Sequence, residues 1–186
     1  LVLRYFGGFS PRSSKSWSGG HVPIFMDRIF NDLPVDIHGN GSQTRSMSYV
    51  DDLVYGTILA IENQHAVGEI INLGSDEELS VLDTAVLIHK IADTGKNLKL
   101  NFVPMSAVFG NYKDIQRRKP DLTKAKDLLG YQPSISFEEG IKKMVAAYRE
   151  WILYDNVLNF ANFMPIKKMY PLGSANRRYS RKSRTR

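Results

Sequence analysis

The segment from His38 to Leu53 joins a tight turn, an arginine and the start of a helix within one short stretch of sequence. A strand-like run ends at His38, and Gly39 and Gly41 supply the positive φ values that a tight turn requires. Arg45 follows this turn and precedes a second strand-like run. The segment therefore predicts two short strands joined through a turn, followed at once by a helix.

Arg45 is a candidate anion-binding residue, because a guanidinium presents a planar, permanently charged fork to a phosphate group. The same pattern also fits a plain hairpin whose arginine pairs with a surface carboxylate. Taken alone, this stretch favours the simpler interpretation. The choice between the two therefore depends on the rest of the chain.

Strand-like and helix-like patterns alternate along residues 1–155, which predicts the α/β fold class. Strands are expected over residues 1–6, 34–38, 47–50, 69–73 and 98–103. Helices are expected over residues 20–33, 51–63, 80–95, 122–129 and from 136 to about 156, with Gly95 and Gly130 as helix ends. The side chains expected to cap helix N-termini are Asp51, Ser80, Asp121 and Ser136. The apolar side of the 51–63 helix is expected to carry Leu53, Ile58 and Ile61.

The composition is that of a globular chain, since 42% of the residues are hydrophobic. The absence of cysteine excludes disulfides and thiolate metal sites, and four scattered histidines indicate no metal site. No apolar run is long enough to span a membrane and nothing resembles a cleavable signal, so we expect a cytoplasmic protein.

The net charge of +6 belongs to the end of the chain. Residues 156–186 hold eight Lys or Arg and no Asp or Glu, while residues 1–155 hold 17 against 19. We therefore expect a domain over residues 1–155 and a disordered basic tail over residues 156–186. A nucleic-acid-binding arm is the alternative, disfavoured because no nucleic-acid motif accompanies the charge.

Several motifs together resemble the C-terminal half of the NAD-dependent nucleotide-sugar epimerases, dehydratases and decarboxylases, the extended short-chain dehydrogenase/reductase family. The resemblance covers residues 1–150 and is closest to UDP-glucuronate decarboxylase and dTDP-glucose 4,6-dehydratase. Its motifs, in family order, are Leu3–Phe6, Ser10–Arg12, Gly20–Phe25, His38–Leu53, Gly68–Ser75 and Arg117–Asp121.

The resemblance implies the substrate-binding portion of an extended Rossmann-type fold, with residues 1–9 and 68–75 as strands of the Rossmann sheet. The chain opens at Leu1 inside an apolar strand, which suggests a piece of a longer protein whose dinucleotide-binding half is missing. Complete members of the family are expected to form homodimers, with no membrane partner.

The sequence holds neither the glycine-rich dinucleotide fingerprint nor the family's catalytic Tyr-x-x-x-Lys pair. In the family this tyrosine takes a proton from the sugar hydroxyl while hydride leaves for NAD. We therefore assign no catalytic residue, expect NAD to be bound mainly by the missing half, and expect the chain alone to be inactive.

The resemblance assigns the nucleotide sugar to one set of residues. It places Arg45 and Arg118 on the diphosphate, although Arg118 also fits a solvated basic cluster with its neighbours. His38 takes the position of a ring against the base, where a turn histidine without function is an equal alternative. The other implied contacts are Gln43 near the ribose or phosphate, Val22 and Pro23 along the nucleotide, and Gly7 in place of a family asparagine.

For the cofactor, the resemblance implies Tyr5 and Phe6 near the nicotinamide, together with Arg12. Tyr5 and Phe6 are equally compatible with a place in the core.

The function implied is binding of a UDP- or dTDP-linked sugar within an NAD-dependent isomerase or lyase that transiently oxidises the sugar. The alternatives are a non-catalytic nucleotide-sugar binder or regulator and, less favoured, a basic-tailed nucleic-acid binder.

Overall fold

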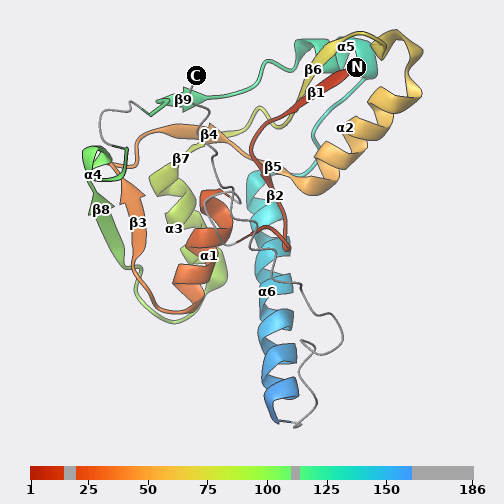
Figure 1. Ribbon diagram of the computed structural model, residues 1–186. Helices are drawn as coiled ribbons and strands as arrows, with labels where there is room; N and C mark the ends of the chain where they lie inside the picture. The colour runs from red at the N-terminus through yellow and green to blue at the C-terminus, as the bar shows by residue number, and fades with distance from the viewer. Residues whose placement is uncertain (15–19, 110–113, 161–186) are drawn as a thin grey trace, which may run out of the picture. The chain divides into compact units, whose positions relative to one another are not determined.

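The computed structural model describes residues 1–14, 20–109 and 114–160 (Figure 1). The chain divides into two units, Leu1–Glu150 and Trp151–Arg186, and the described strands lie in the first. This unit combines short strand pairs, most of them parallel, with helices packed against them, which confirms the α/β fold class. Within the described residues, no helix has the length and apolar character needed to cross a membrane.

One half of the first unit is built on a parallel pair of strands, β1 (Val2–Tyr5) and β6 (Ile70–Leu73). Helices α2 (Val50–Glu62) and α5 (Thr123–Leu129) pack beside β6. This pair confirms the two strands expected at residues 1–6 and 69–73. The core of this half is formed by Ala60, Ala66, Ile71, Leu73, Leu122, Ala125, Leu129 and Tyr131.

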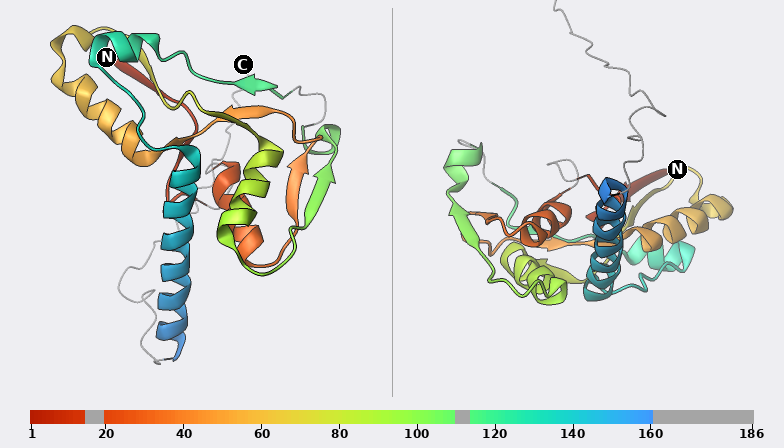
Figure 2. Two further views of the ribbon diagram at one scale, coloured as in Figure 1. Left: turned by 180° about the vertical axis from the view of Figure 1, so that it is seen from behind. Right: turned by 90° about the horizontal axis from the view of Figure 1, so that it is seen from below.

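The other half is built on β3 (Val35–His38) and β8 (Leu100–Val103), which also pair in parallel. Helices α1 (His21–Phe30) and α3 (Val81–Ala92) lie side by side next to this pair (Figure 2). The start of α6 (Phe137–Phe160) contributes to the same core, which includes Val22, Phe25, Met26, Val35, Ile37, Ile88, Phe137 and Ile141.

A three-stranded sheet carries the residues of greatest interest. Its central strand β4 (Thr44–Ser46) is antiparallel to β7 (Glu78–Ser80) and parallel to β9 (Arg117–Arg118). The remaining short elements are β2 (Gly8–Phe9), β5 (Ser48–Tyr49), the 3₁₀ helix Gln64–Ala66 and α4 (Met105–Phe109).

Capping by serine is confirmed at two helices. The Ser80 hydroxyl accepts a hydrogen bond from the Asp83 amide at 2.9 Å, and Ser136 accepts one from the Glu139 amide at 3.2 Å. Gly130 ends α5 in a left-handed conformation, as expected. These motifs are local, so neighbouring residues alone determine them.

The expected cap at Asp51 is wrong. Helix α2 begins one residue earlier, after Tyr49, which makes no side-chain cap. Asp52 is the buried acid instead: its carboxylate accepts hydrogen bonds from the amides of Ser134 and Ile135, at 2.9 and 3.1 Å. A contact so distant in sequence leaves no local pattern.

The expected apolar side of α2 is correct for Leu53, which packs against the core, and wrong for Ile58 and Ile61, which are 47% and 73% exposed. The helix packs through small residues, because a Cβ added at Gly56 would come within 2.8 Å of Leu73 and Tyr131. Close approach to β6 therefore decides which face is buried.

Further boundaries differ from expectation, among them the end of α1, which lies at Phe30 and not at residue 33. Helix α3 ends at Ala92, with Asp93 in a left-handed conformation, before Gly95. Asp121 precedes the N-cap of α5, although its carboxylate accepts a hydrogen bond from the Thr123 amide at 2.9 Å. Helix α6 continues to Phe160, and residues 161–186 of the expected tail lie outside the described residues.

Candidate diphosphate site

The pairing of β4 with β9 brings two distant arginines together. In the parallel register Arg45 lies opposite Arg118. Paired residues on neighbouring strands point to the same face of a sheet, and strands lie about 4.8 Å apart. The two guanidinium groups predicted to hold the diphosphate therefore belong to one face.

On the opposite face of this sheet, the positive charge of Arg117 is neutralised by an ion pair with Glu78. Arg117, one residue from Arg118, donates to both oxygens of Glu78, with its Nε 2.9 Å from Oε1 and its Nη2 2.9 Å from Oε2. Thr44 also donates to Glu78. These hydrogen bonds, first from Arg117 and then from Thr44, lower the pKa of Glu78 to about 2. Strand alternation thus separates Arg117 from Arg118, and the two do not act as one basic cluster.

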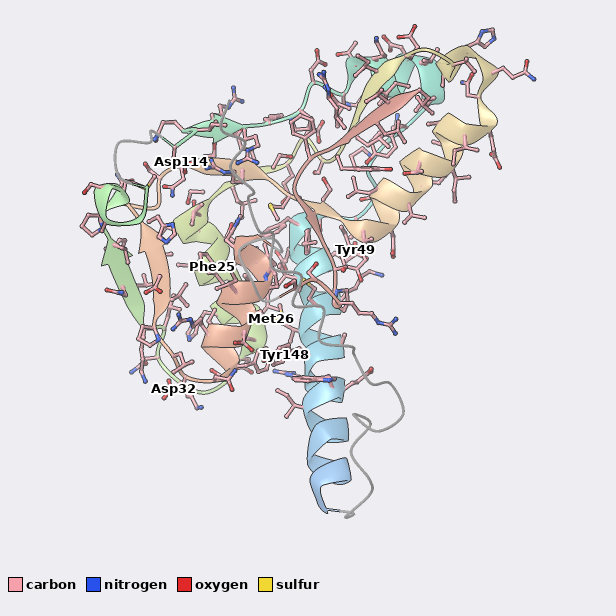
Figure 3. The ribbon with its side chains drawn as sticks, viewed as in Figure 1. Phe25, Met26, Asp32, Tyr49, Asp114 and Tyr148 are labelled. Atoms are coloured by element: carbon pink, nitrogen blue, oxygen red, sulfur yellow. The ribbon has the colours of Figure 1, made fainter. Side chains whose placement is uncertain are left out.

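Arg45 is fixed in place by its surroundings. Its Nη2 donates to Asp114 Oδ2 at 2.8 Å, and its Nη1 donates to the carbonyls of Ile115 and Thr44 at 2.7 and 2.8 Å. The side chains of Arg45 and Asp114 are only 12% and 17% exposed, and Asp114 lies beside β4 and β9 (Figure 3). Arg45 is thus a preoriented cation that already has one carboxylate partner.

Arg118 has the opposite character. It is exposed, and within the described residues its side chain makes no hydrogen bond or ion pair. Its guanidinium therefore keeps its donors available for an anion.

His21 is a further titratable residue on which the charges of Arg45 and Arg118 act, and no pattern in the sequence selects it. It is the first residue of α1, and its ring lies edge-on to Phe25, with centroids 5.4 Å apart. Its Nε2 atom is buried and has no hydrogen-bond partner among the described residues. Burial first, then the charges of Arg45 and Arg118, lower its pKa to about 4.

A buried polar atom without a partner is unfavourable by about 1–3 kcal/mol, so such atoms call for an explanation. The only motif containing His21 is the segment Gly20–Phe25, in which the family pattern points to Val22 and Pro23. A lone histidine at a helix start has no spacing that marks it. The charges of Arg45 and Arg118 act on its pKa because the fold brings together residues that are distant in the sequence.

The turn before β4 is held by its own side chains. Gln43 is buried, and its amide nitrogen donates to the His38 carbonyl at 2.9 Å. Gly41 has φ +76°, and a Cβ there would come within 2.9 Å of both Ile37 and Leu82. His38 ends β3, half-buried and paired with Val103. The roles of His38 and Gln43 toward a nucleotide remain predictions.

Gly7 lies against the β4–β5 connection. Its φ is +56°, and an added Cβ would overlap the Ser46 carbonyl oxygen and lie 3.0 Å from Met47 Sδ. Its own carbonyl accepts a hydrogen bond from the Ser48 amide at 2.9 Å. The backbone therefore excludes a side chain at this position, where the family pattern has asparagine.

Val22 and Pro23 form the first turn of α1, and both are buried. Their side chains belong to the packed interior, so any contact with a nucleotide would come from their backbone.

The predicted cofactor residues do not form a site by themselves. Tyr5 is 55% exposed, and its hydroxyl lies 2.9 Å from Thr57 Oγ1 on α2. The Phe6 amide and carbonyl are both used, by Leu73 and Ser48. Arg12 is exposed in the turn after β2. Nothing in these contacts frames a dinucleotide, and no metal-binding group of side chains occurs among the described residues.

Comparison with known proteins gives a consistent result. The family model described as GDP-mannose 4,6 dehydratase matches residues 1–144. A UDP-N-acetyl-alpha-D-glucosaminuronate decarboxylase from Bacillus cytotoxicus is 35% identical over 150 residues, which are 80% of this chain and 46% of that protein. UDP-glucuronic acid decarboxylase 1 from Arabidopsis thaliana is 35% identical over 155 residues, covering 83% of this chain and 33% of the relative.

Solved structures agree. UDP-glucuronic acid 4-epimerase from Bacillus cereus, in complex with UDP-glucuronic acid and NAD, matches with a TM-score of 0.71 and 30% identity, over 81% of this chain and 45% of that one. UDP-glucose 4-epimerase from Thermotoga maritima, with UDP-glucose, gives 0.70 and 32%, over 81% and 46%. The chain thus spans less than half the length of each of these proteins. The chain belongs to the family of nucleotide-sugar epimerases, dehydratases and decarboxylases, the extended short-chain dehydrogenases/reductases.

Proposed function

We propose that the first unit of this chain binds the diphosphate of a UDP-linked sugar and is the substrate-binding part of an NAD-dependent epimerase or decarboxylase. One observation carries the proposal: Arg45 and Arg118 lie in register on one face of the β4–β9 pair. UDP is favoured over dTDP because the named relatives and solved complexes concern UDP-sugars.

The two arginines suit a diphosphate because they differ. Arg45, held by Asp114, would offer a fixed point of attachment, and exposed Arg118 would close on the second phosphate. Hydrogen bonds from guanidinium to phosphate are charge-assisted and frequently bidentate, so they add geometric specificity as well as energy. The backbone at Val22 and Pro23 and the ring of His38 would then follow the nucleotide.

The reaction itself would need the dinucleotide-binding half of the family fold. Bound NAD would supply the transient oxidation of the sugar there. The residues of this chain would bind the nucleotide and orient the sugar, and they would transfer no proton to or from the reacting sugar. Their contribution would therefore be seen in substrate affinity.

The test is calorimetric titration of the full chain with UDP-glucuronic acid. We expect saturable binding that Arg118→Ala weakens by about 1.5–3 kcal/mol, roughly ten- to hundredfold in Kd. Arg117→Ala is the matched control, since this arginine is bound to Glu78 on the other face. Equal affinities for all three proteins, or no saturable binding by the unmodified chain, would contradict the proposal.

A further inference from the structure

We infer that His21 is a third, proton-dependent contact of the diphosphate site, so that a nucleotide sugar is bound together with a proton at this ring. The inference rests on the proposed function and deepens it. It makes affinity for the diphosphate depend on pH in a range where the ligand itself does not titrate.

The first support is a nitrogen of the His21 ring that has no hydrogen-bond partner among the described residues. This atom, Nε2, is buried, and the ring makes an edge-type contact with Phe25. Histidine opens α1, whose first turn holds no acidic side chain and whose N-cap, Gly20, makes no side-chain cap. The N-terminus of a helix carries a partial positive charge and favours an anion. A phosphate oxygen would satisfy both the ring nitrogen and the helix end.

The second support is the balance of charge. Arg45 and Arg118 contribute two positive charges, and Asp114 neutralises one of them. A nucleotide-sugar diphosphate is a diester with two negative charges at neutral pH. A proton on His21 supplies the missing positive charge, so the occupied site becomes neutral.

The direction of the pH effect follows from linkage. Without ligand, burial and the two arginines keep the ring neutral, with a pKa of about 4. Two negative charges at the site oppose the arginines and raise this pKa. A ligand that raises a pKa binds the protonated protein more tightly. Affinity is therefore greatest below about pH 4, and is lost as the pH rises through the raised pKa of the complex.

Other charged groups lie on the elements that pack against α1. Helix α3 carries Asp83, His89, Lys90 and the following Asp93, and β3 carries Asp36 and His38. From α6, the Tyr148 hydroxyl donates to Asp27 at 2.8 Å, six residues along α1 from His21. The charges that act on the His21 pKa are those of Arg45 and Arg118.

The experiment titrates the full chain with UDP-glucose, which has no carboxylate, at pH 5.5, 6.5 and 7.5. Two buffers with different ionisation enthalpies give the number of protons taken up. We expect affinity to rise about five- to tenfold from pH 7.5 to 5.5, within the limit of tenfold per pH unit for one proton. In parallel, the ring resonances of His21 should report a pKa that rises on adding UDP-glucose.

Three variants assign the proton. His21→Gln keeps a hydrogen-bonding group that cannot titrate, and should bind with a flat pH profile. His38→Gln tests the other histidine predicted near the nucleotide, and the exposed His65→Gln is the neutral control; both should keep the slope. If His21→Gln does not fold, the resonances of the unmodified chain decide alone.

The outcomes separate the two proposals. Binding that depends on Arg118 but shows no pH slope, or a slope that only His38→Gln removes, overturns the role of His21 and leaves the diphosphate site intact. No Arg118-dependent binding at any pH overturns both.

Discussion

At the scale of single residues, Arg45 and Arg118 have equal charge and unequal surroundings. Arg45 donates three hydrogen bonds, to Asp114, Ile115 and Thr44. These bonds fix the orientation of its guanidinium before any ligand binds. Preorganisation of this kind lowers the entropic cost of binding. The sequence predicted Arg45 as an anion site but also left open an ion pair with a carboxylate, and the structure contains that ion pair.

We therefore expect Arg45→Ala to raise the Kd for UDP-glucuronic acid roughly ten- to hundredfold, and Arg45→Lys to recover only part, because an ammonium keeps the charge but loses the fork. Calorimetry measures both. Arg45→Ala also leaves Asp114 without its partner, so the double variant with Asp114→Ala separates lost binding from lost folding. Unchanged affinity with a lowered melting temperature would make Arg45 a purely structural residue.

Gly7 gives a second prediction at this scale. Gly7→Ala combines a left-handed φ, unfavourable by about 1–2 kcal/mol, with overlap against Ser46, for which overpacking adds about 1–3 kcal/mol. Gly68 has φ +85° and open space around it, so Gly68→Ala is the matched control for φ alone. Urea unfolding of both variants should show the larger loss at Gly7, and equal losses would contradict the proposed overlap.

At the scale of elements, the sequence predicted what neighbouring residues decide. Ser80 and Ser136 cap their helices, and Gly130 ends α5, because each motif is complete within four residues or fewer. Two adjacent acids, Asp51 and Asp52, were indistinguishable by pattern at the start of α2. Their roles are decided by the loop before α6, which supplies the amides that bind Asp52.

This difference can be measured. Ser80→Ala should lower the free energy of unfolding by about 1 kcal/mol, the usual cost of a lost N-cap. Asp51→Ala removes only an exposed charge from the first turn of α2, and should cost about 0.3–1 kcal/mol at low salt and less at high salt. Thermal unfolding at two salt concentrations compares them. A salt-independent loss at Asp51 as large as that at Ser80 would contradict the cap assignment.

At the scale of the whole molecule, the fold class and the two strands β1 and β6 were predicted correctly, but periodicity could not show which helix faces are covered. Val54, Tyr55, Ile58 and Ile61 of α2 all remain at least 47% exposed. An apolar stripe on a helix is the same pattern whether it meets the core of its own unit or another surface. His21 escaped notice for a related reason, since the two arginines whose charges act on its pKa belong to strands that are distant in the sequence.

The exposed residues of α2 predict self-association of the isolated chain. Ile61→Glu should reduce association in sedimentation or light-scattering measurements without lowering the melting temperature, because the side chain is 73% exposed. Ile71→Glu, in the buried strand β6, is the contrast and should unfold the chain. A drop in melting temperature for Ile61→Glu would show that this face is packed in solution.

The short edge strand β9 is expected to open locally. The strand has two residues, pairs with β4 alone among the described strands, and is held from the other face by the Arg117–Glu78 pair. Such a short edge can detach by local opening at far less free energy than global unfolding. Amide hydrogens of Arg117 and Arg118 should therefore exchange much faster than those of β6. A diphosphate bound to both Arg45 and Arg118 would hold β9 against β4. Ligand binding should therefore slow the amide exchange of the strand that carries Arg118.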